Sequence, residues 1–470
     1  MFSKSQDNVF TMKAQKLMAI LLTLSFSLAL FGCRKVNSSF PSVEVTSTET
    51  TETTTVTTET KHFTHTISIA SPLSYETCVY IAKLYALKNS GQLAEGVSGE
   101  NITLDYLDSI DLPFALNVYS TAETGCNADT LRQWQESGSL PDIFLTDSFD
   151  EVVQAGYAIP VTRYLSDETL LTPGNIYPKM LEQLYLNNEY YGIPYQASAY
   201  LMYADMEVLN RAGIQEISFK QDLNSFGAIL DTLSGLNAEA MEILPFYLAQ
   251  GLIPYLPISL YGDTYRSVRD GKTLSSKSWK DSLEYLKTVV ASGKAYESLD
   301  TETVSTFFQG MSPLLSRKVG IWAGSSDEVS RYDNYMPNTL VMMQIPSTDK
   351  ENYSPAMLSV YPLCISSSCD QPAETVKFAS FMALDEDALL LASRLDLKEG
   401  FLPVVSSSTV WKNMVSTQKY GSFLSPFQSL MQDAVYIPAV TEKQEYEADL
   451  QYIATHLDSL IVEKITEETE

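Results

Sequence analysis

Short strand patterns alternate with helical patterns along most of this chain, and this alternation constrains its fold more than any other feature. Alternating or continuous apolar runs predict strands, and apolar residues at helical spacing predict helices between them. The expected strands are 66–69, 102–107, 114–119, 141–145, 198–203, 319–322 and 340–345. The expected helices are 75–87, 129–137, 283–290, 372–384 and 444–464. Two short helices are also expected, one capped by Asp150 and ended by Gly156, the other capped by Asp205 and ended by Gly213. Strands that alternate with helices favour a mainly parallel sheet, so the sequence predicts an α/β fold.

The N-terminal region has the order of a secretory signal. Lys13 and Lys16 precede an apolar stretch from Leu17 to Phe31, which is short for a membrane span of about 20 residues. The run Ala29-Leu30-Phe31-Gly32-Cys33 resembles a bacterial lipobox. We therefore expect cleavage after residue 32 and a lipid on the Cys33 thiol, which would anchor the protein to the outer face of the cell membrane. The alternative is an ordinary signal peptide with a chance cysteine.

Residues 33–62 are expected to form a disordered linker. Ten of the fifteen residues from Thr46 to Thr60 are threonine, and three more are glutamate. Such a tract has almost nothing apolar to bury. As a flexible coil it would hold a folded domain roughly 30 Å from the anchor.

Composition limits the class of partner. The chain has 470 residues, of which 45% are hydrophobic, so the part after the linker can form two or three lobes with real cores. The formal net charge is −27, which argues against nucleic acid, because a phosphate backbone requires Lys and Arg. The same charge disfavours anionic membrane surfaces, so contact with a membrane is expected only through the lipid.

Searches for catalytic, cofactor and metal motifs find almost nothing. The chain has no dinucleotide-type GxGxxG, no GxSxG and no DxDxDG run. It has three histidines, His62, His65 and His456, so a Ser-His-Asp triad or a histidine-rich zinc site is not expected. We predict a protein that is not an enzyme and needs no metal or cofactor. A glycosidase stays open, because it needs only two suitably spaced carboxyl groups.

Four cysteines remain besides Cys33. Cys364 and Cys369 are close in sequence and could bridge a turn in an exported protein. Cys78 falls in a predicted helix, where a small buried apolar role is expected, and Cys126 has no indicated partner. Their pairing stays open.

A series of short motifs in a fixed order carries a family resemblance. The motifs are Gly138-Ser-Leu-Pro-Asp-Ile-Phe144, Ile159-Pro-Val-Thr162, Tyr190-Tyr-Gly-Ile-Pro-Tyr195, Tyr203-Ala-Asp205, Ala212-Gly-Ile214, Phe307-Phe-Gln-Gly310, Gly320-Ile-Trp322, Ile365-Ser366 and Gly400-Phe-Leu-Pro403. Together they resemble the extracellular, sugar-type solute-binding proteins of bacterial ABC importers, the maltodextrin-binding relatives. The lipobox agrees with this resemblance, because such receptors are often lipoproteins.

The resemblance implies a two-lobe, type II periplasmic-binding-protein-like fold with hinge strands and a ligand cleft. Lobe one would hold 63–196 and 344–398, and lobe two would hold 197–343 and 399–470. The implied function is a monomeric receptor that delivers a small solute, an oligosaccharide in particular, to an ABC permease. Alternatives are a sensory receptor coupled to a membrane kinase, a surface glycosidase and a structural adhesin.

Trp322 is the strongest candidate for a ligand contact. It matches the Gly-x-Trp of the family, whose indole lines the cleft, and a flat aromatic face stacks on the C–H face of a sugar. The alternative is a tryptophan that belongs to the core.

Polar residues after predicted strands form the second group of candidates. Thr146, Asp147 and Ser148 follow the strand at 141–145, and parallel sheets present ligands at the carboxyl ends of their strands. A helix cap or a solvated loop is the alternative for Asp147. Gln196, Ser198 and Tyr200 lie where the chain should cross between lobes, although alternate strand positions could instead point into a core. Weaker candidates are Ser71, Ser74, Ser325 and Tyr361.

Overall fold

The computed structural model describes residues 65–165, 175–177, 180–181, 183–186, 188–236, 243–247, 281, 285, 288–289, 292–296, 305–336, 338–347, 358–396 and 400–415. The predicted signal segment 1–32 with Cys33, the linker and the predicted helix at 444–464 lie outside these residues. So does most of the predicted helical face at 283–290.

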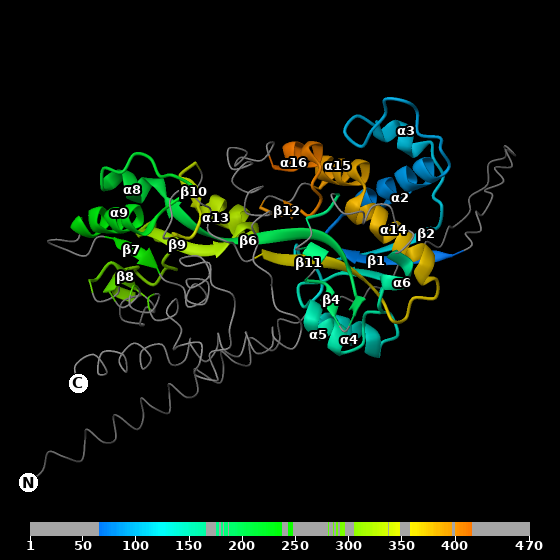
Figure 1. The fold of residues 1–470 in the computed structure, drawn as a ribbon, viewed down its shortest axis with the longest axis horizontal. Helices are drawn as coiled ribbons and strands as arrows, with labels where there is room; N and C mark the ends of the chain where they lie inside the picture. The colour runs from blue at the N-terminus through cyan, green and yellow to red at the C-terminus, as the bar shows by residue number, and fades with distance from the viewer. Residues whose placement is uncertain are drawn as a thin grey trace, which may run out of the picture. The chain divides into compact units, whose positions relative to one another are not determined.

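A ten-stranded mixed sheet organises the described chain, and one long strand connects its two halves (Figure 1). This strand, β6, runs from Ile193 to Asp205, and twelve of its thirteen residues are buried. The order of the main path is β2-β1-β3-β11-β6-β9-β7-β8, with β10 and β12 also paired to β6. The α/β class predicted from the sequence is confirmed, but the sheet is mixed rather than mainly parallel, because β6 pairs antiparallel with β9, β10, β11 and β12.

The first half of the sheet combines parallel and antiparallel strands. β1 (Thr66–Ser71) pairs in parallel with β2 (Ala115–Ser120) and β3 (Ile143–Leu145). β11 (Leu358–Ile365) lies antiparallel between β3 and β6. A separate hairpin joins β4 (Tyr185–Leu186) to β5 (Glu189–Tyr190).

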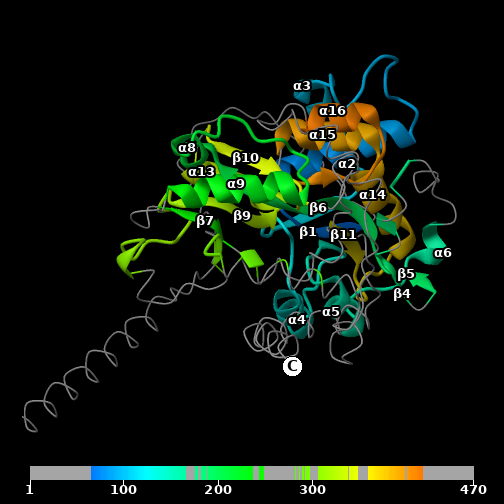
Figure 2. The same cartoon turned by 60° about the vertical axis from the view of Figure 1, so that its left-hand side comes forward.

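Helices cover both faces of this half (Figure 2). Leucine and isoleucine side chains of α2 (Tyr75–Asn89) pack on one face with α14 (Pro372–Leu384) and α15 (Glu386–Leu395). On the other face, α4 (Ala128–Glu136) and α5 (Phe149–Gln154) bury Leu131, Phe149 and Val152. Two short helices, α3 (Leu104–Asp108) and α6 (Thr162–Leu165), complete this half.

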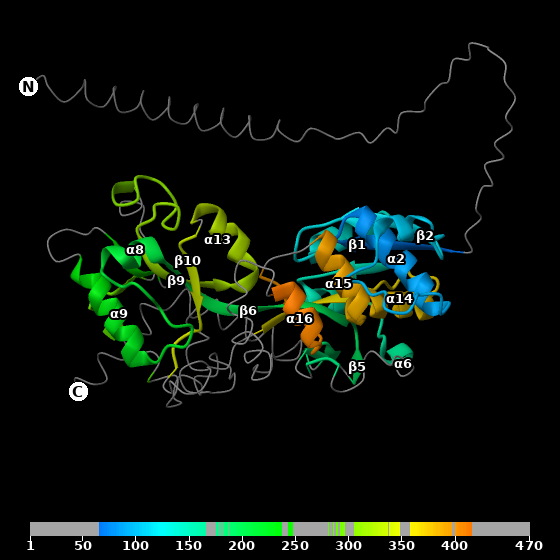
Figure 3. The ribbon, with the colours of Figure 1, turned by 90° about the horizontal axis from the view of Figure 1, so that it is seen from above.

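The second half of the sheet is likewise covered on both faces (Figure 3). Its strands are β7 (Leu244–Tyr247), β8 (Ala295–Tyr296), β9 (Val319–Ser325) and β10 (Leu340–Met343). α9 (Leu223–Gly235) packs on the Met202 face of β6, together with α8 (Met206–Arg211). α13 (Val329–Tyr335) packs on the Tyr203 face and follows the short 3₁₀ helix η3 (Ser326–Glu328). This division follows from the alternation of side chains along a strand.

Both edges of β6 change partners within the same few residues. One edge pairs with β11 over residues 193–199 and with β10 over residues 202–205. The other edge pairs with β12 (Leu402–Pro403) at 196–197 and with β9 over 200–204. Between the last two, the Ala199 N–H donates to the buried Ser326 hydroxyl at 3.0 Å, and that hydroxyl donates to the Gly400 carbonyl at 2.7 Å.

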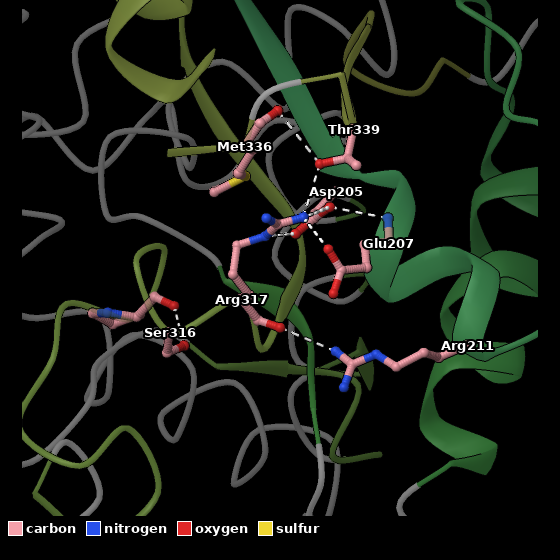
Figure 4. A network of polar contacts seen from close by, with 8 residues as sticks. Asp205, Glu207, Arg211, Ser316, Arg317, Met336 and Thr339 are labelled. Atoms are coloured by element: carbon pink, nitrogen blue, oxygen red, sulfur yellow. Dashed lines mark hydrogen bonds and ion pairs between the residues drawn. The ribbon is translucent and has the colours of Figure 1, made fainter. Parts of the chain in front are cut away.

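A buried ion pair fixes the far end of β6 (Figure 4). Asp205 is fully buried and caps α8, because its carboxylate accepts from the Glu207 N–H at 3.0 Å. Arg317 donates to both Asp205 oxygens, at 2.6 and 2.9 Å, and also to Glu207 and Thr339. Arg317 has a φ of 55°, a region that non-glycine residues seldom adopt. These side-chain bonds hold it there and join the start of β9 to the start of α8.

Several local predictions are confirmed by the structure. β1, β2, β3, β9 and β10 fall within a few residues of the strands expected from the sequence, as do helices α2, α4 and α14. Asp205 caps a helix as predicted, and Gly156 and Gly213 have positive φ values of 74° and 81°, as expected where a helix ends.

Two local predictions are wrong. Residues 102–107 were expected to form a strand, but α3 begins at Leu104 because the Thr103 hydroxyl accepts from the Tyr106 N–H and caps a helix. Asp150 was expected to cap α5, but it lies in the first turn and Ser148 occupies the cap position. The four cysteines Cys78, Cys126, Cys364 and Cys369 are all free, so the possible Cys364–Cys369 bridge is not formed.

The structure also differs from the expected lobe boundaries. Residues 344–347 were assigned to lobe one, but Gln344 and Ser347 donate backbone hydrogen bonds to Phe219 and Gln221. Residues 400–415 were assigned to lobe two, but Trp411 of α16 (Ser408–Val415) packs against Tyr177, with ring centroids 6.0 Å apart. α16 also packs against α15. The remaining stretch from 416 to 470 lies outside the described residues.

Candidate ligand-binding site

Polar side chains meet where β6 and β11 cross the middle of the sheet. Gln196 and Tyr361 are directly opposed partners in the antiparallel pairing, so their side chains share one face. Ser198, two residues further along β6, lies on the same face. These three residues are more than nine-tenths buried, and the sequence had singled out all of them.

The Tyr361 hydroxyl is the centre of this group, which we call the Tyr361 group and which consists of Gln196, Ser198, Tyr361 and Asp327. It donates to Asp327 Oδ2 at 3.0 Å, and Asp327 comes from η3 after β9. Ser198 Oγ lies 3.2 Å from the same hydroxyl. Because the single Tyr361 proton is directed to Asp327, Ser198 must be the donor in its own bond to Tyr361. Burial raises the pKa of Tyr361, and the Asp327 carboxylate raises it further, so the hydroxyl stays protonated and donating.

Residues at the carboxyl end of β3 take two different roles. Thr146 is fully buried, and its hydroxyl donates to the Cys126 carbonyl at 2.7 Å, so its role is structural. Asp147 is exposed and accepts from the hydroxyls of Thr124 at 3.1 Å and Ser148 at 2.8 Å. The Asp147 carboxylate is also a minor cause of the raised pKa of Tyr361, after burial and Asp327.

Gln196 connects this group to the loop that follows β2. Its Nε2 donates to the Glu123 carbonyl at 3.2 Å, next to the Thr124 that holds Asp147. Sequence reasoning missed Glu123, Thr124 and Asp327. The rule that loops after strand ends carry ligand contacts could have found all three, because they follow β2 and β9 directly.

Ser71 and Ser74 are not bonded to the Tyr361 hydroxyl; they flank Pro72 and Leu73, which line a neighbouring hollow. Ser71 is fully buried and accepts from the Leu73 N–H, whereas Ser74 caps α2 and donates to Asp396 Oδ2 at 2.9 Å. The hollow has a volume of about 30 Å³, and its lining includes Asp396 together with Leu73, Gln196, Phe401 and Met414. A space of this size suits about one or two water molecules and is far too small for a sugar.

The structure places Trp322 inside the core. Its side chain is 1% exposed, and its ring stacks on Tyr203 with centroids 5.9 Å apart and meets the edge of Tyr332 at 5.5 Å. Neither face of the indole is therefore available to a ligand in the described structure. The family pattern Gly-x-Trp identified an aromatic residue of β9, but the Tyr332 of α13 that covers it could not be seen in that pattern.

The last two predicted site residues flank the Tyr361 group. Ser325 ends β9 and is the cap residue of η3: its N–H donates to Glu328 Oε2 at 3.1 Å, and its carbonyl accepts from the Tyr203 hydroxyl at 2.6 Å. Tyr200 is half-buried on the face of β6 that carries Ser198 and packs beside Met202. Of the residues that sequence analysis proposed, Gln196, Ser198 and Tyr361 are thus brought together, and Asp147 is connected to them through the loop that holds Glu123 and Thr124.

No group of three or more His, Cys, Asp or Glu side chains suited to a metal ion occurs among the residues that the structure describes. Within the same part of the chain, no helix is both long and apolar enough to cross a bilayer.

Comparison with known proteins identifies one family. The family model described as bacterial extracellular solute-binding protein matches residues 118–389. No curated protein matches the sequence.

Solved structures share the two-lobe, type II α/β fold at low sequence identity. An ABC substrate-binding protein from Listeria monocytogenes in complex with cycloalternan is 14% identical, with a TM-score of 0.59, and 84% of this chain and 93% of that chain are covered. The sugar-binding protein MalE from Xanthomonas citri is 12% identical, with a TM-score of 0.54 and coverage of 86% and 99%. The GacH receptor of Streptomyces glaucescens, solved unliganded and with acarbose, is 14% identical, with a TM-score of 0.55 and coverage of 85% and 94%.

Proposed function

This chain belongs to the bacterial extracellular solute-binding protein family, and we propose that it captures a carbohydrate outside the cell and delivers it to an ABC importer. The observation that carries the proposal is the convergence of Ser198 and Asp327 on the Tyr361 hydroxyl, with Gln196 paired beside Tyr361 on the same face of the crossing strands. Hydroxyls and carboxylates of this kind supply the partners that sugar hydroxyls need once they leave water. The protein acts by binding and release, without catalysis.

The Tyr361 group is suited to sense closure of the two lobes. Ser198 and Tyr361 come from the crossing strands, whereas Asp327 comes from the short helix after β9 in the second half of the sheet. A solute bonded to both sets of groups would favour the arrangement in which they face each other, because a ligand shifts an equilibrium by its differential affinity.

The anchoring part of the proposal rests on the sequence. A lipid on Cys33 and the threonine-rich linker at 33–62 would hold the receptor near its permease on the outer face of the membrane. Labelling cells with a radioactive fatty acid tests this proposal, and Cys33→Ser should abolish the label. A labelled Cys33→Ser protein would contradict it.

A ligand screen by thermal unfolding tests the proposed binding function. Purified protein is titrated with maltotetraose, other neutral oligosaccharides and amino sugars. A ligand at a hundred times its dissociation constant should raise the free energy of unfolding by about 2.7 kcal/mol. If no carbohydrate stabilises the protein, the proposed function is wrong.

Tyr361→Phe tests whether the Tyr361 group is the binding site. The variant keeps the ring but removes the hydroxyl that joins Ser198 to Asp327. We expect affinity for the sugar found in the screen to fall about fivefold to thirtyfold, which corresponds to about 1–2 kcal/mol for a lost buried hydrogen bond. The control is Tyr335→Phe, at a tyrosine that is 45% exposed, and it should bind normally. Unchanged binding by Tyr361→Phe would place the site elsewhere.

A further inference from the structure

Among the residues that the structure describes, Asp327 and Asp147 have no basic partner. Asp327 Oδ2 accepts from Tyr361, while its Oδ1 is buried without a hydrogen-bond partner. Asp147 is exposed, and the described groups that donate to it are the hydroxyls of Thr124 and Ser148. No described Lys or Arg forms an ion pair with either aspartate.

The deeply buried aspartates of the described core each pair with a base. The two that are at least nine-tenths buried are Asp205 and Asp385. Asp205 pairs with Arg317 at 2.6 Å, and Asp385 pairs with Lys88 at 2.9 Å. This is the usual arrangement, because a carboxylate removed from water is costly unless a base or several donors satisfy it. Asp327 is less deeply buried than these two, and no base among the described residues pairs with it.

The electrostatic surroundings on both sides of Gln196 are negative. Burial is the main reason that the pKa of Tyr361 and that of Cys126 are raised, and the Asp147 carboxylate raises both further. Beside the hollow, the pKa of Tyr195 is raised mainly by burial, and the Asp396 carboxylate raises it further. No described Lys, Arg or His lowers the pKa of any of these three groups. A positive charge brought here is stabilised by several carboxylates at once.

We propose that the solute carries a protonated amine and is an amino sugar, and that this ammonium group binds at Asp327 and Asp147. The proposal rests on the carbohydrate-binding function proposed above and refines its substrate class. An ammonium has three donors and no acceptor, so it can donate to the unused Asp327 Oδ1 and keep two donors, one of which we assign to Asp147. Ser198 and Gln196 remain for the hydroxyls of the same ligand.

Calorimetric titration with three tetrasaccharides tests the proposal. The full chain is titrated with a glucosamine tetrasaccharide at a pH where its amines are protonated, with the N-acetylated tetrasaccharide, and with maltotetraose. We expect the free amine to bind at least tenfold more tightly than either neutral sugar at low salt. That preference should shrink as salt is added, because ions screen charge attraction.

Two conservative variants identify the groups responsible. Asp327→Asn and Asp147→Asn keep an acceptor oxygen for Tyr361 or for Thr124 but remove the negative charge. Each should reduce about tenfold the ratio of the affinity for the free amine to the affinity for the neutral sugars. The control, Glu95→Gln, removes the same charge from an exposed loop and should leave the preference unchanged.

The outcomes separate the two proposals. If maltotetraose or the N-acetylated sugar binds as tightly as the free amine, the amino-sugar class is wrong while the carbohydrate receptor stands. If the amine is preferred equally by Asp327→Asn, Asp147→Asn and the unmodified chain, the preference arises from net charge and the assigned site is wrong. If none of the three sugars binds, while the thermal screen finds another neutral ligand, only the present inference fails.

Discussion

A single residue, Trp322, shows how burial decides between two roles that one motif allows. The sequence offered it as a stacking surface for a sugar or as a core residue. The structure gives it Tyr203 on one face and the edge of Tyr332 on another side, and leaves 1% of it exposed. In this structure its contribution is to stability: it ties β9 to β6 and α13.

Trp322→Ala is therefore expected to destabilise the fold. Removing a fully buried tryptophan deletes its contacts and leaves a cavity, which typically costs about 3–5 kcal/mol. Urea denaturation of the ligand-free protein measures this change. Tyr335→Ala, at an exposed tyrosine of the same helix α13, should cost less than about 1 kcal/mol. A Trp322→Ala protein with normal stability but no sugar binding would instead restore the stacking role.

At the scale of elements, the short helix η3 and the segment before β12 are held together by one serine. Ser326 bonds to the Ala199 N–H and to the Gly400 carbonyl, so β6, η3 and residue 400 meet at a single buried hydroxyl. Gly400 approaches so closely that an added Cβ would lie 2.0 Å from the Ser326 carbonyl oxygen, and its φ is 85°. Only glycine satisfies both conditions.

Gly400→Ala should therefore lower the free energy of unfolding more than an ordinary glycine substitution does. We compare it with Gly91→Ala, because Gly91 also has a positive φ, 67°, but an added Cβ there meets nothing within 4 Å. Gly91→Ala should cost about 1–2 kcal/mol for the backbone conformation alone. Gly400→Ala should cost about 2 kcal/mol more, because the backbone of η3 must move. If urea denaturation showed equal losses in the free energy of unfolding for the two variants, the contact between Gly400 and η3 would not be tight in solution.

Elements that depend on local sequence were predictable, and contacts between distant segments were not. Period and capping residues identified β1, α2, β6 and α14, whereas the strand expected at 102–107 failed because the Thr103 cap outweighed its apolar pattern. The candidate site shows the same division. Gln196, Ser198 and Tyr361 could be found from strand positions, but Asp327 joins them only because η3 folds back onto β11, a contact that spans 34 residues.

At the scale of the whole molecule, the resemblance predicted the family and the two-lobe fold correctly, because the order of many weak motifs carries more information than any one of them. It did not predict where the chain returns between lobes. Residues 344–347 bond to Phe219 and Gln221, and α16 packs on α15, contacts that depend on tertiary packing rather than on a motif.

Small-angle X-ray scattering can test closure of the whole protein. If a carbohydrate brings the two lobes together, the radius of gyration should fall when the ligand from the screen is added at saturating concentration. Tyr361→Phe at the same ligand concentration should show a smaller fall, because fewer molecules are occupied. An unchanged radius with full occupancy, measured by calorimetry, would mean that binding occurs without closure.

The change of partners along β6 has a consequence for such a movement. On one edge of β6, residues 200 and 201 lie between the pairing with β11 and the pairing with β10. On the other edge, residues 198 and 199 lie between the pairing with β12 and the pairing with β9, and the Ser326 hydroxyl accepts the Ala199 N–H there. Small changes in φ and ψ spread over these few peptides can turn one half of the sheet against the other while most pairings stay intact. Side-chain bonds at Ser326 and Tyr361 then resist the turning, so single substitutions at these two residues should change the ease of opening.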